Sequence, residues 1–171
     1  MKLPIQLRNK DSKKRQSGFT FVELIISFGI IAILFSIGYV SIANIQTKSA
    51  SNASVSVIIS DIKSQQIKAM TGDTEGRGTP DTYGVKILPN SYILFHGSVY
   101  NPLDPSNFSI PAPSGHTFST LLPNNSIIFS TGKGEITGFV DGQNTITLTN
   151  TRSGRTQTVH FNKYGTVTNV N

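Results

Sequence analysis

A single carboxylate interrupts the long apolar stretch near the start of the chain. From Phe19 to Ala43 the sequence has no charged side chain except Glu23. A carboxylate in the hydrocarbon of a membrane costs about 2.5–3.5 kcal/mol on insertion scales, so acids at this depth are rare and usually paired. Glu23 therefore needs a compensating cation, and the chemistry that this segment could perform is an electrostatic pairing near the start of a helix.

A new chain terminus could supply that cation. Cleavage between Gly18 and Phe19 would remove a basic leader, residues 1–18, and would leave an ammonium group about one helical turn from Glu23. The positive end of the helix dipole would also favour a carboxylate at this place. The alternative is an acid that reaches the membrane interface and has no role in assembly.

The apolar segment that follows is long enough to cross a bilayer. Leu24–Ala43 has twenty residues, which corresponds to about 30 Å of helix. Residues 1–18 hold six of the fifteen Lys and Arg residues and one acid, and the positive-inside rule retains such an end in the cytoplasm. We therefore expect a transmembrane helix over 19–43 with the rest of the chain outside the cytoplasm. A buried helix of a soluble protein is the alternative.

The order of these features resembles the signal of type IV prepilins. It combines a basic run, Gly18, Phe19, Glu23 and an apolar helix. The resemblance implies cleavage after Gly18 by a membrane prepilin peptidase, N-methylation of Phe19, and pairing of Glu23 with the terminal amine of a neighbouring subunit. Further residues that fit the signal are Thr20, Phe21, Val22 and Leu24.

The charge of the chain is concentrated in the leader. The whole sequence has a net charge of +6, of which residues 1–18 contribute +5, from six basic residues and one acid. Residues 19–171 keep nine basic and eight acidic residues, so bulk charge does not indicate a polyanionic partner. The sequence has no cysteine, which excludes disulfides and thiolate metal sites.

An amphipathic segment continues the helix beyond the membrane. No proline occurs between Pro4 and Pro80, and apolar residues over 44–71 recur at helical spacing. Gly72 is the expected stop, and a break is possible over 48–54, which is rich in Ser and Asn. The stripe, which we expect to pack under the chain's own β domain, consists of Val55, Ile58, Ile59, Ile62 and Ala69.

Residues 72–171 have the pattern of a small antiparallel β domain. We expect an irregular excursion over 101–117, because this segment contains four prolines. The predicted fold class is α+β, a long N-terminal helix with a transmembrane half and an amphipathic half packed on this domain. The expected strands are 83–88, 91–96, 126–129, 136–140, 145–148, 156–161 and 166–170.

Three groups of residues in the β domain could carry chemistry. The histidines, His96, His116 and His160, are not at metal-ligand spacing, so we expect packing or surface roles for them. A glycine-rich loop contains three acids that could hold Ca²⁺, which are Asp73, Glu75 and Asp81. The simpler interpretation is a solvated loop without a bound ion. Basic residues near the C-terminal hairpin could contact DNA: Arg152, Arg155 and Lys163.

The sequence is therefore predicted to encode a structural subunit and not an enzyme, with no cofactor. The long helix followed by a small β domain, together with the Thr-rich C-terminal segment 145–169, resembles minor pilins and pseudopilins of the GspH/FimT type. The resemblance implies a subunit of a type IV pilus or of a type II secretion pseudopilus. The resemblance implies prepilin peptidase, other pilin subunits and the cytoplasmic membrane as partners. The alternatives are a ligand-binding tip subunit that contacts DNA or a surface, and a single-pass anchored enzyme.

Overall fold

The structure, a computed structural model, describes the backbone of residues 18–171 and the side chains of residues 18–36 and 51–171. Residues 1–17, which hold nearly all of the predicted leader, lie outside the described residues. The chain divides into two compact units, Met1–Ala43 and Asn44–Asn171. We call them the N-terminal unit and the globular unit.

One helix, α1 (Phe21–Thr71), contributes to both units, and its backbone is helical through residues 48–54, where the sequence suggested a possible break. The helix ends at the predicted glycine. Gly72 has φ +67°, and its N–H donates to the carbonyl of Ala69 at 3.3 Å. The N–H of Asp73 donates to the carbonyl of Lys68 at 2.9 Å. These two bonds and the left-handed glycine form a Schellman ending, which satisfies carbonyls that have no partner within the helix.

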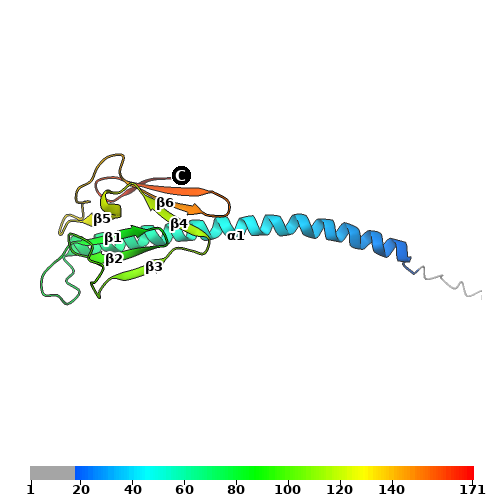
Figure 1. Ribbon diagram of the computed structural model, residues 1–171, viewed down its shortest axis with the longest axis horizontal. Helices are drawn as coiled ribbons and strands as arrows, with labels where there is room; N and C mark the ends of the chain where they lie inside the picture. The colour runs from blue at the N-terminus through cyan, green and yellow to red at the C-terminus, as the bar shows by residue number, and fades with distance from the viewer. Residues whose placement is uncertain (1–17) are drawn as a thin grey trace, which may run out of the picture. The chain divides into compact units, whose positions relative to one another are not determined.

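Two four-stranded antiparallel sheets form the rest of the globular unit (Figure 1). The first has the order β3-β2-β1-β5, and the second has the order β4-β6-β7-β8. The strands of the first sheet are β1 (Tyr83–Leu88), β2 (Ser91–His96), β3 (Phe108–Pro111) and β5 (Ser126–Phe129). Those of the second are β4 (His116–Thr120), β6 (Thr145–Asn150), β7 (Thr156–Phe161) and β8 (Val167–Val170), and a 3-10 turn (Pro123–Asn125) precedes β5.

The α+β fold class is confirmed, but the prediction for 101–117 was wrong in part. β3 lies inside this segment and β4 begins there. β3 is an edge strand, and its Pro111 lies opposite Ser91 of β2. An edge strand tolerates proline because one side of its backbone has no neighbouring strand to receive an N–H. Prolines therefore restrict where a strand can lie in a sheet, and they do not exclude one.

The strand predicted over 136–140 was also wrong. This segment makes one isolated bridge, between Ile136 and Phe129 of β5. Gly138 has φ +66°, a left-handed conformation that an extended strand does not contain. The apolar side chains suggested a strand, but the backbone turns too early for a ladder to form.

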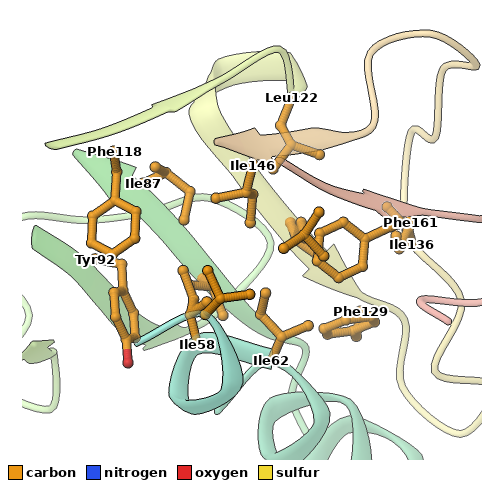
Figure 2. Packing of buried hydrophobic residues seen from close by; sticks show 14 of the residues in the cluster. Ile58, Ile62, Ile87, Tyr92, Phe118, Leu122, Phe129, Ile136, Ile146 and Phe161 are labelled. Carbon is orange, nitrogen blue, oxygen red and sulfur yellow. The ribbon is translucent and has the colours of Figure 1, made fainter. Parts of the chain in front are cut away.

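The helix stripe and the inner faces of both sheets form one core. The predicted stripe residues Val55, Ile58, Ile62 and Ala69 are buried, and Ile59 is half-buried against them. Figure 2 shows Ile58 and Ile62 pointing from α1 toward residues of the sheets. The rings of Tyr92 in β2 and Phe118 in β4 meet edge to face, with centroids 5.7 Å apart. The prediction that this part of the helix packs under its own β domain is confirmed.

A buried hydrogen-bonding side chain on α1 and a glycine on β1 hold the elements of this unit close together. The Gln66 side chain, which is buried, donates from Nε2 to the carbonyls of Gly134 at 2.8 Å and Tyr164 at 2.6 Å. It therefore connects α1 with two loops. On β1, a Cβ at Gly84 would lie 2.6 Å from both the Phe95 ring and the Ile127 carbonyl, so only glycine fits there without displacement.

Candidate functional site

Among the residues that the structure describes, Gly18, Phe19 and Thr20 precede α1. The Thr20 hydroxyl oxygen accepts the Glu23 N–H at 3.3 Å, and the Thr20 carbonyl accepts the Leu24 N–H at 3.1 Å. Thr20 is therefore the N-cap of α1, and Glu23 is the third helical residue. Sequence reasoning missed this cap, although the Thr-x-x-Glu spacing is typical of a capping box and would have identified it.

The position of Glu23 in the first turn of α1 favours an acidic side chain. The first turn of a helix carries a partial positive charge, which favours a carboxylate there. The Ser27 hydroxyl donates to the Glu23 carbonyl at 2.7 Å. Phe19, the predicted new terminus, lies one turn before Glu23 and is 78% exposed. The pairing of Glu23 with a terminal ammonium stays a prediction, and the geometry places the carboxylate where such a pair could form.

Apolar side chains of the N-terminal unit are exposed along the described part of α1. Phe21 and Phe35, for example, are 78% and 75% exposed. Residues 37–43 of the predicted 19–43 span lie outside the side chains that the structure describes. No helix within the described residues has the length and apolar character required to cross a membrane.

The structure does not bring the three predicted calcium ligands together. Asp73 accepts the backbone N–H of Glu75, Glu75 forms ion pairs with Lys68 at 2.6 Å and Arg77 at 2.9 Å, and Asp81 contacts a histidine of β2. Burial alone would raise the pKa of Glu75, but its bonds to the two basic side chains lower it below the ordinary value. Among the described residues, no three His, Cys, Asp or Glu side chains form a group that could hold a metal ion.

A histidine held between two carboxylates is a feature that sequence reasoning missed. His96 Nδ1 lies 2.8 Å from Asp81 Oδ2, and its Nε2 lies 2.9 Å from Asp104 Oδ2. Both ring nitrogens can donate only in the protonated, positively charged form. Burial raises the pKa of Asp81, but hydrogen bonds from His96 and the Thr82 amide outweigh burial and hold it below the usual value. The group joins the end of β2 to two loops.

The pKa of Asp104 is also lowered, chiefly because the hydroxyl and the backbone N–H of Ser106 donate to its carboxylate. These two bonds, at 2.6 and 2.9 Å, hold the carboxylate in the loop between β2 and β3. Asp104 is thus fixed by its own loop on one side and by His96 on the other.

The other two histidines have the packing and surface roles that the sequence predicts. His116 is buried at the start of β4, where its Nε2 lies 2.7 Å from the Ser51 hydroxyl and 3.2 Å from Asn150 Nδ2. Its Nδ1 lies 3.1 Å from the Ser114 carbonyl. His160 lies on β7 and is partly exposed. The contacts of His116 join α1 to the second sheet.

The predicted DNA-binding residues divide into two places. Arg152 and Arg155 are exposed in the turn between β6 and β7. Lys163 lies in the turn after β7, at the other end of that strand, and its Nζ is 3.4 Å from Glu135. The structure therefore brings two of the three basic side chains into one turn and separates the third from them.

Comparison with known families explains the N-terminal features. Residues 13–39 match the family described as a prokaryotic N-terminal methylation motif, and this range contains Gly18, Phe19 and Glu23. Neither a curated protein nor a solved structure matches the chain. The match supports a type IV prepilin-like signal. It implies a membrane-anchored precursor of the pilin or pseudopilin type, which prepilin peptidase processes and which assembles with other pilin subunits, and it points to a structural protein.

Proposed function

We propose that this chain is a minor subunit of a type IV pilus or a type II secretion pseudopilus, of the GspH/FimT type. The match over residues 13–39 carries the proposal, because it contains the cleavage, methylation and assembly positions in order. The two-sheet globular unit on the second half of α1 agrees with the domain that such a subunit presents on a filament.

Processing would create the charge that Glu23 requires. Prepilin peptidase cuts between Gly18 and Phe19 on the cytoplasmic side, and Phe19 is then methylated at its new amino group. The basic leader is removed, and an ammonium remains next to the first turn of α1. This step converts an isolated carboxylate in an apolar helix into one half of an ion pair.

Assembly would place that carboxylate against a neighbour. The subunit waits in the cytoplasmic membrane with the globular unit outside the cytoplasm, and its Glu23 pairs with the Phe19 amine of the adjoining subunit. Exposed apolar side chains such as Phe21 and Phe35 then pack against neighbouring helices in the filament. The ion pair sets the register of the incoming subunit, and the apolar contacts hold it.

Processing is tested by the mass of the new terminus. The full chain is expressed with and without a prepilin peptidase, and the N-terminal peptide is analysed by mass spectrometry. A product that begins at methylated Phe19 supports the proposal, and Gly18→Leu should prevent its formation. A chain that keeps residues 1–18 in the presence of an active peptidase would contradict it.

The role of Glu23 is tested by two substitutions of similar size. Glu23→Gln removes the charge and should abolish incorporation into filaments while membrane insertion is retained. Glu23→Asp keeps the charge and should retain part of the incorporation. Quantitative blotting of sheared filaments and of membranes measures both. Equal incorporation of Glu23→Gln and the unmodified chain would eliminate the pairing role.

DNA contact is a second candidate role, supported by the shared turn of Arg152 and Arg155. Each phosphate contact contributes about 0.9 to the salt slope for duplex DNA, so replacing both arginines by alanine should lower the slope by about two. Lys163→Ala, at the other end of β7, is the matched control. A gel-shift titration in which the unmodified chain does not bind, or in which the double variant binds equally well, would remove this role.

A further inference from the structure

Most of the loop between β2 and β3, residues 98–107, which we call the cover loop, is hydrogen-bonded mainly to itself. The Asp104 N–H and the Asn107 side-chain amide, for example, both donate to the carbonyl of Asn101, at 3.2 and 2.7 Å. Among the described residues, a single hydrogen-bonded ion pair connects the cover loop to another part of the chain. It joins Asp104 Oδ2 to His96 Nε2 at 2.9 Å.

The cover loop packs on the face of the first sheet that lies opposite the core. Val85 of β1 belongs to the core, so the preceding residue, Gly84, faces the other side of the sheet. The Phe95 ring lies over Gly84, and the Tyr100 ring of the cover loop meets it edge to face, with centroids 5.5 Å apart. The Lys86 ammonium lies 5.9 Å from the Tyr100 ring. Phe95 is 3% exposed, and the cover loop contributes to this burial.

The two contacts of His96 require a proton on each ring nitrogen. Nδ1 lies 2.8 Å from Asp81 Oδ2, and Nε2 lies 2.9 Å from Asp104 Oδ2, so each nitrogen faces an oxygen that only accepts. A neutral imidazole has one N–H, and the lone pair on its other nitrogen repels a carboxylate oxygen at this distance. Loss of one proton to water therefore breaks one of the two contacts.

The contact with Asp104 is the one that opens. The backbone beside Asp81 is held at the end of β2 in either form of the ring, because the Gly97 N–H donates to the Thr82 carbonyl at 2.8 Å. Asp104 has no second connection of this kind, since its other hydrogen bonds lie within the cover loop. The N–H of a neutral His96 ring therefore stays with Asp81, and the lone pair faces Asp104.

The remaining charges near His96 are paired with one another. These charged or titratable groups are Lys68 of α1, Glu75 and Arg77 of the loop before β1, and Tyr83 of β1. Glu75 forms ion pairs with both basic side chains, at 2.6 and 2.9 Å. Burial raises the pKa of Tyr83, so its hydroxyl is neutral. Among the described residues, His96 is thus the one cation in hydrogen-bond contact with Asp81 and Asp104.

We propose that the cover loop is a pH-sensitive cover of the Phe95 ring, closed while His96 is protonated and released when His96 is neutral. Histidine is the side chain that ordinarily changes its charge between about pH 5 and 8. Burial raises the pKa of Asp81, but hydrogen bonds from His96 and the Thr82 amide hold it below the ordinary value. Bonds from Ser106 lower the pKa of Asp104. Both carboxylates therefore stay charged in the range where histidine titrates, and they release the loop again only below about pH 4.

This proposal concerns the globular unit alone and goes beyond the proposed filament role. A chain that is neither processed nor assembled would still have the cover loop and its histidine. Closure of the loop and incorporation into filaments are separate measurements, so the two proposals can fail separately.

The test uses the full chain, isotope-labelled and held in a zwitterionic detergent, between pH 5 and 9. NMR signals of the His96 ring report its protonation, and the nuclear Overhauser effect between the Phe95 and Tyr100 rings reports closure. We expect the ratio of closed to open loop to fall about tenfold or more as the pH rises, the effect of one lost hydrogen bond between charged groups. The fall should follow the same curve as the His96 signals. His160→Gln, on β7, is the matched control and should leave this curve unchanged.

Asp104→Asn should reverse the direction of the pH dependence. The hydroxyl and the backbone N–H of Ser106 both donate to Oδ1 of Asp104, at 2.6 and 2.9 Å. An asparagine that keeps this oxygen in place presents its amide N–H to His96 Nε2, where it fits the lone pair of the neutral ring and not the N–H of the charged one. The cover loop of this variant should therefore close as His96 loses its proton. His96→Gln, which does not titrate, should show the same closure from pH 5 to 9.

Three results would overturn the proposal. They are a constant ring-to-ring signal while His96 titrates, a His96 ring that does not titrate between pH 5 and 9, and a pH dependence of unchanged direction in Asp104→Asn. A contact with only a structural role would give weaker closure of that variant at every pH, without a reversal. Circular dichroism verifies that each variant is folded. If His96→Gln does not fold, the unmodified chain and Asp104→Asn, at a partly exposed loop position, decide the question.

Discussion

Ile33 in the first half of α1 is 63% exposed, whereas Ile62 in the second half is fully buried. The two residues have the same side chain and the same helical backbone. They differ in what surrounds them, because the second half packs against two sheets of its own chain and the described side chains of the first half do not have such a cover. One helix therefore contributes buried side chains to a core in its second half and carries exposed apolar side chains in the described part of its first half.

The largest expected difference in stability is between alanine substitutions at these two isoleucines. Ile62→Ala should lower the free energy of unfolding of the globular unit by about 2–5 kcal/mol, because it leaves a cavity in a packed core. Ile33→Ala should leave that free energy unchanged. Denaturant titration of the purified chain, followed by tyrosine fluorescence since the sequence has no Trp, measures both. Similar losses in the two variants would break the comparison.

A smaller loss of stability is expected when the hydrogen bonds of Gln66, in the second half of α1, are removed. Gln66→Met removes the donor that serves the carbonyls of Gly134 and Tyr164, and a buried acceptor without a donor costs about 1–3 kcal/mol. The same titration should show a loss in this range. Gln143→Met, at an exposed loop position, is the control and should have little effect. No difference between the variants would mean that water replaces the Gln66 amide at no cost.

The first half of α1 should depend on its cap. Thr20→Ala removes the acceptor for the Glu23 N–H and should weaken the first turn by about 0.5–2 kcal/mol. Thr20→Ser keeps the hydroxyl and should preserve the turn. Hydrogen exchange of the Glu23 amide reports the local opening in each variant. The globular unit should keep its stability in both variants. Unchanged hydrogen exchange of the Glu23 amide in Thr20→Ala would show that the Thr20 hydroxyl does not stabilise the first turn.

The smallest effect comes from a partly buried carboxylate of the globular unit, Asp81. The pKa of Asp81 is lower in the folded chain than its ordinary value, since bonds from His96 and the Thr82 amide outweigh the effect of burial. Its stabilisation is therefore complete above a pH of about 4 and is lost as the pH falls through the folded pKa. The side chain is about one-third exposed, so we expect less than about 1 kcal/mol.

Asp81→Asn should remove this part of the acid dependence, and Asp141→Asn, at an exposed loop position, should not. Unfolding measured at pH 6 and pH 3 makes the comparison. Equal pH dependence in Asp81→Asn and the unmodified chain would show that the contact with His96 contributes no stability.

Patterns between neighbours in the sequence were enough to predict much of the fold. The stripe of Val55, Ile58 and Ile62 follows helical periodicity, and Gly72 ends the helix as predicted because left-handed backbone favours glycine. The strands β1, β2, β5, β6, β7 and β8 also lie at or within about two residues of their predicted positions. In each case the signal is local, and tertiary packing agrees with it.

Contacts between distant residues were not predictable in this way. His96 meets Asp81 and Asp104 because two loops return to the end of β2, and no spacing rule connects these positions. The burial of the Gln65 side chain, which is 3% exposed, is likewise a product of tertiary packing. The prepilin-like signal was recognisable from the sequence because its residues are contiguous.

The missing side chain of Gly84 leaves a gap that the aromatic ring of Phe95 occupies on the neighbouring strand. We therefore expect the residues at these two positions to vary together. Homologous chains that carry alanine or a larger residue in place of Gly84 should carry a smaller one in place of Phe95 and a displaced β5, because the Ile127 carbonyl also lies 2.6 Å from the Cβ position. Lineages that retain the ring should retain the glycine. An alignment in which the two positions vary independently would show that the strands can separate to accommodate both.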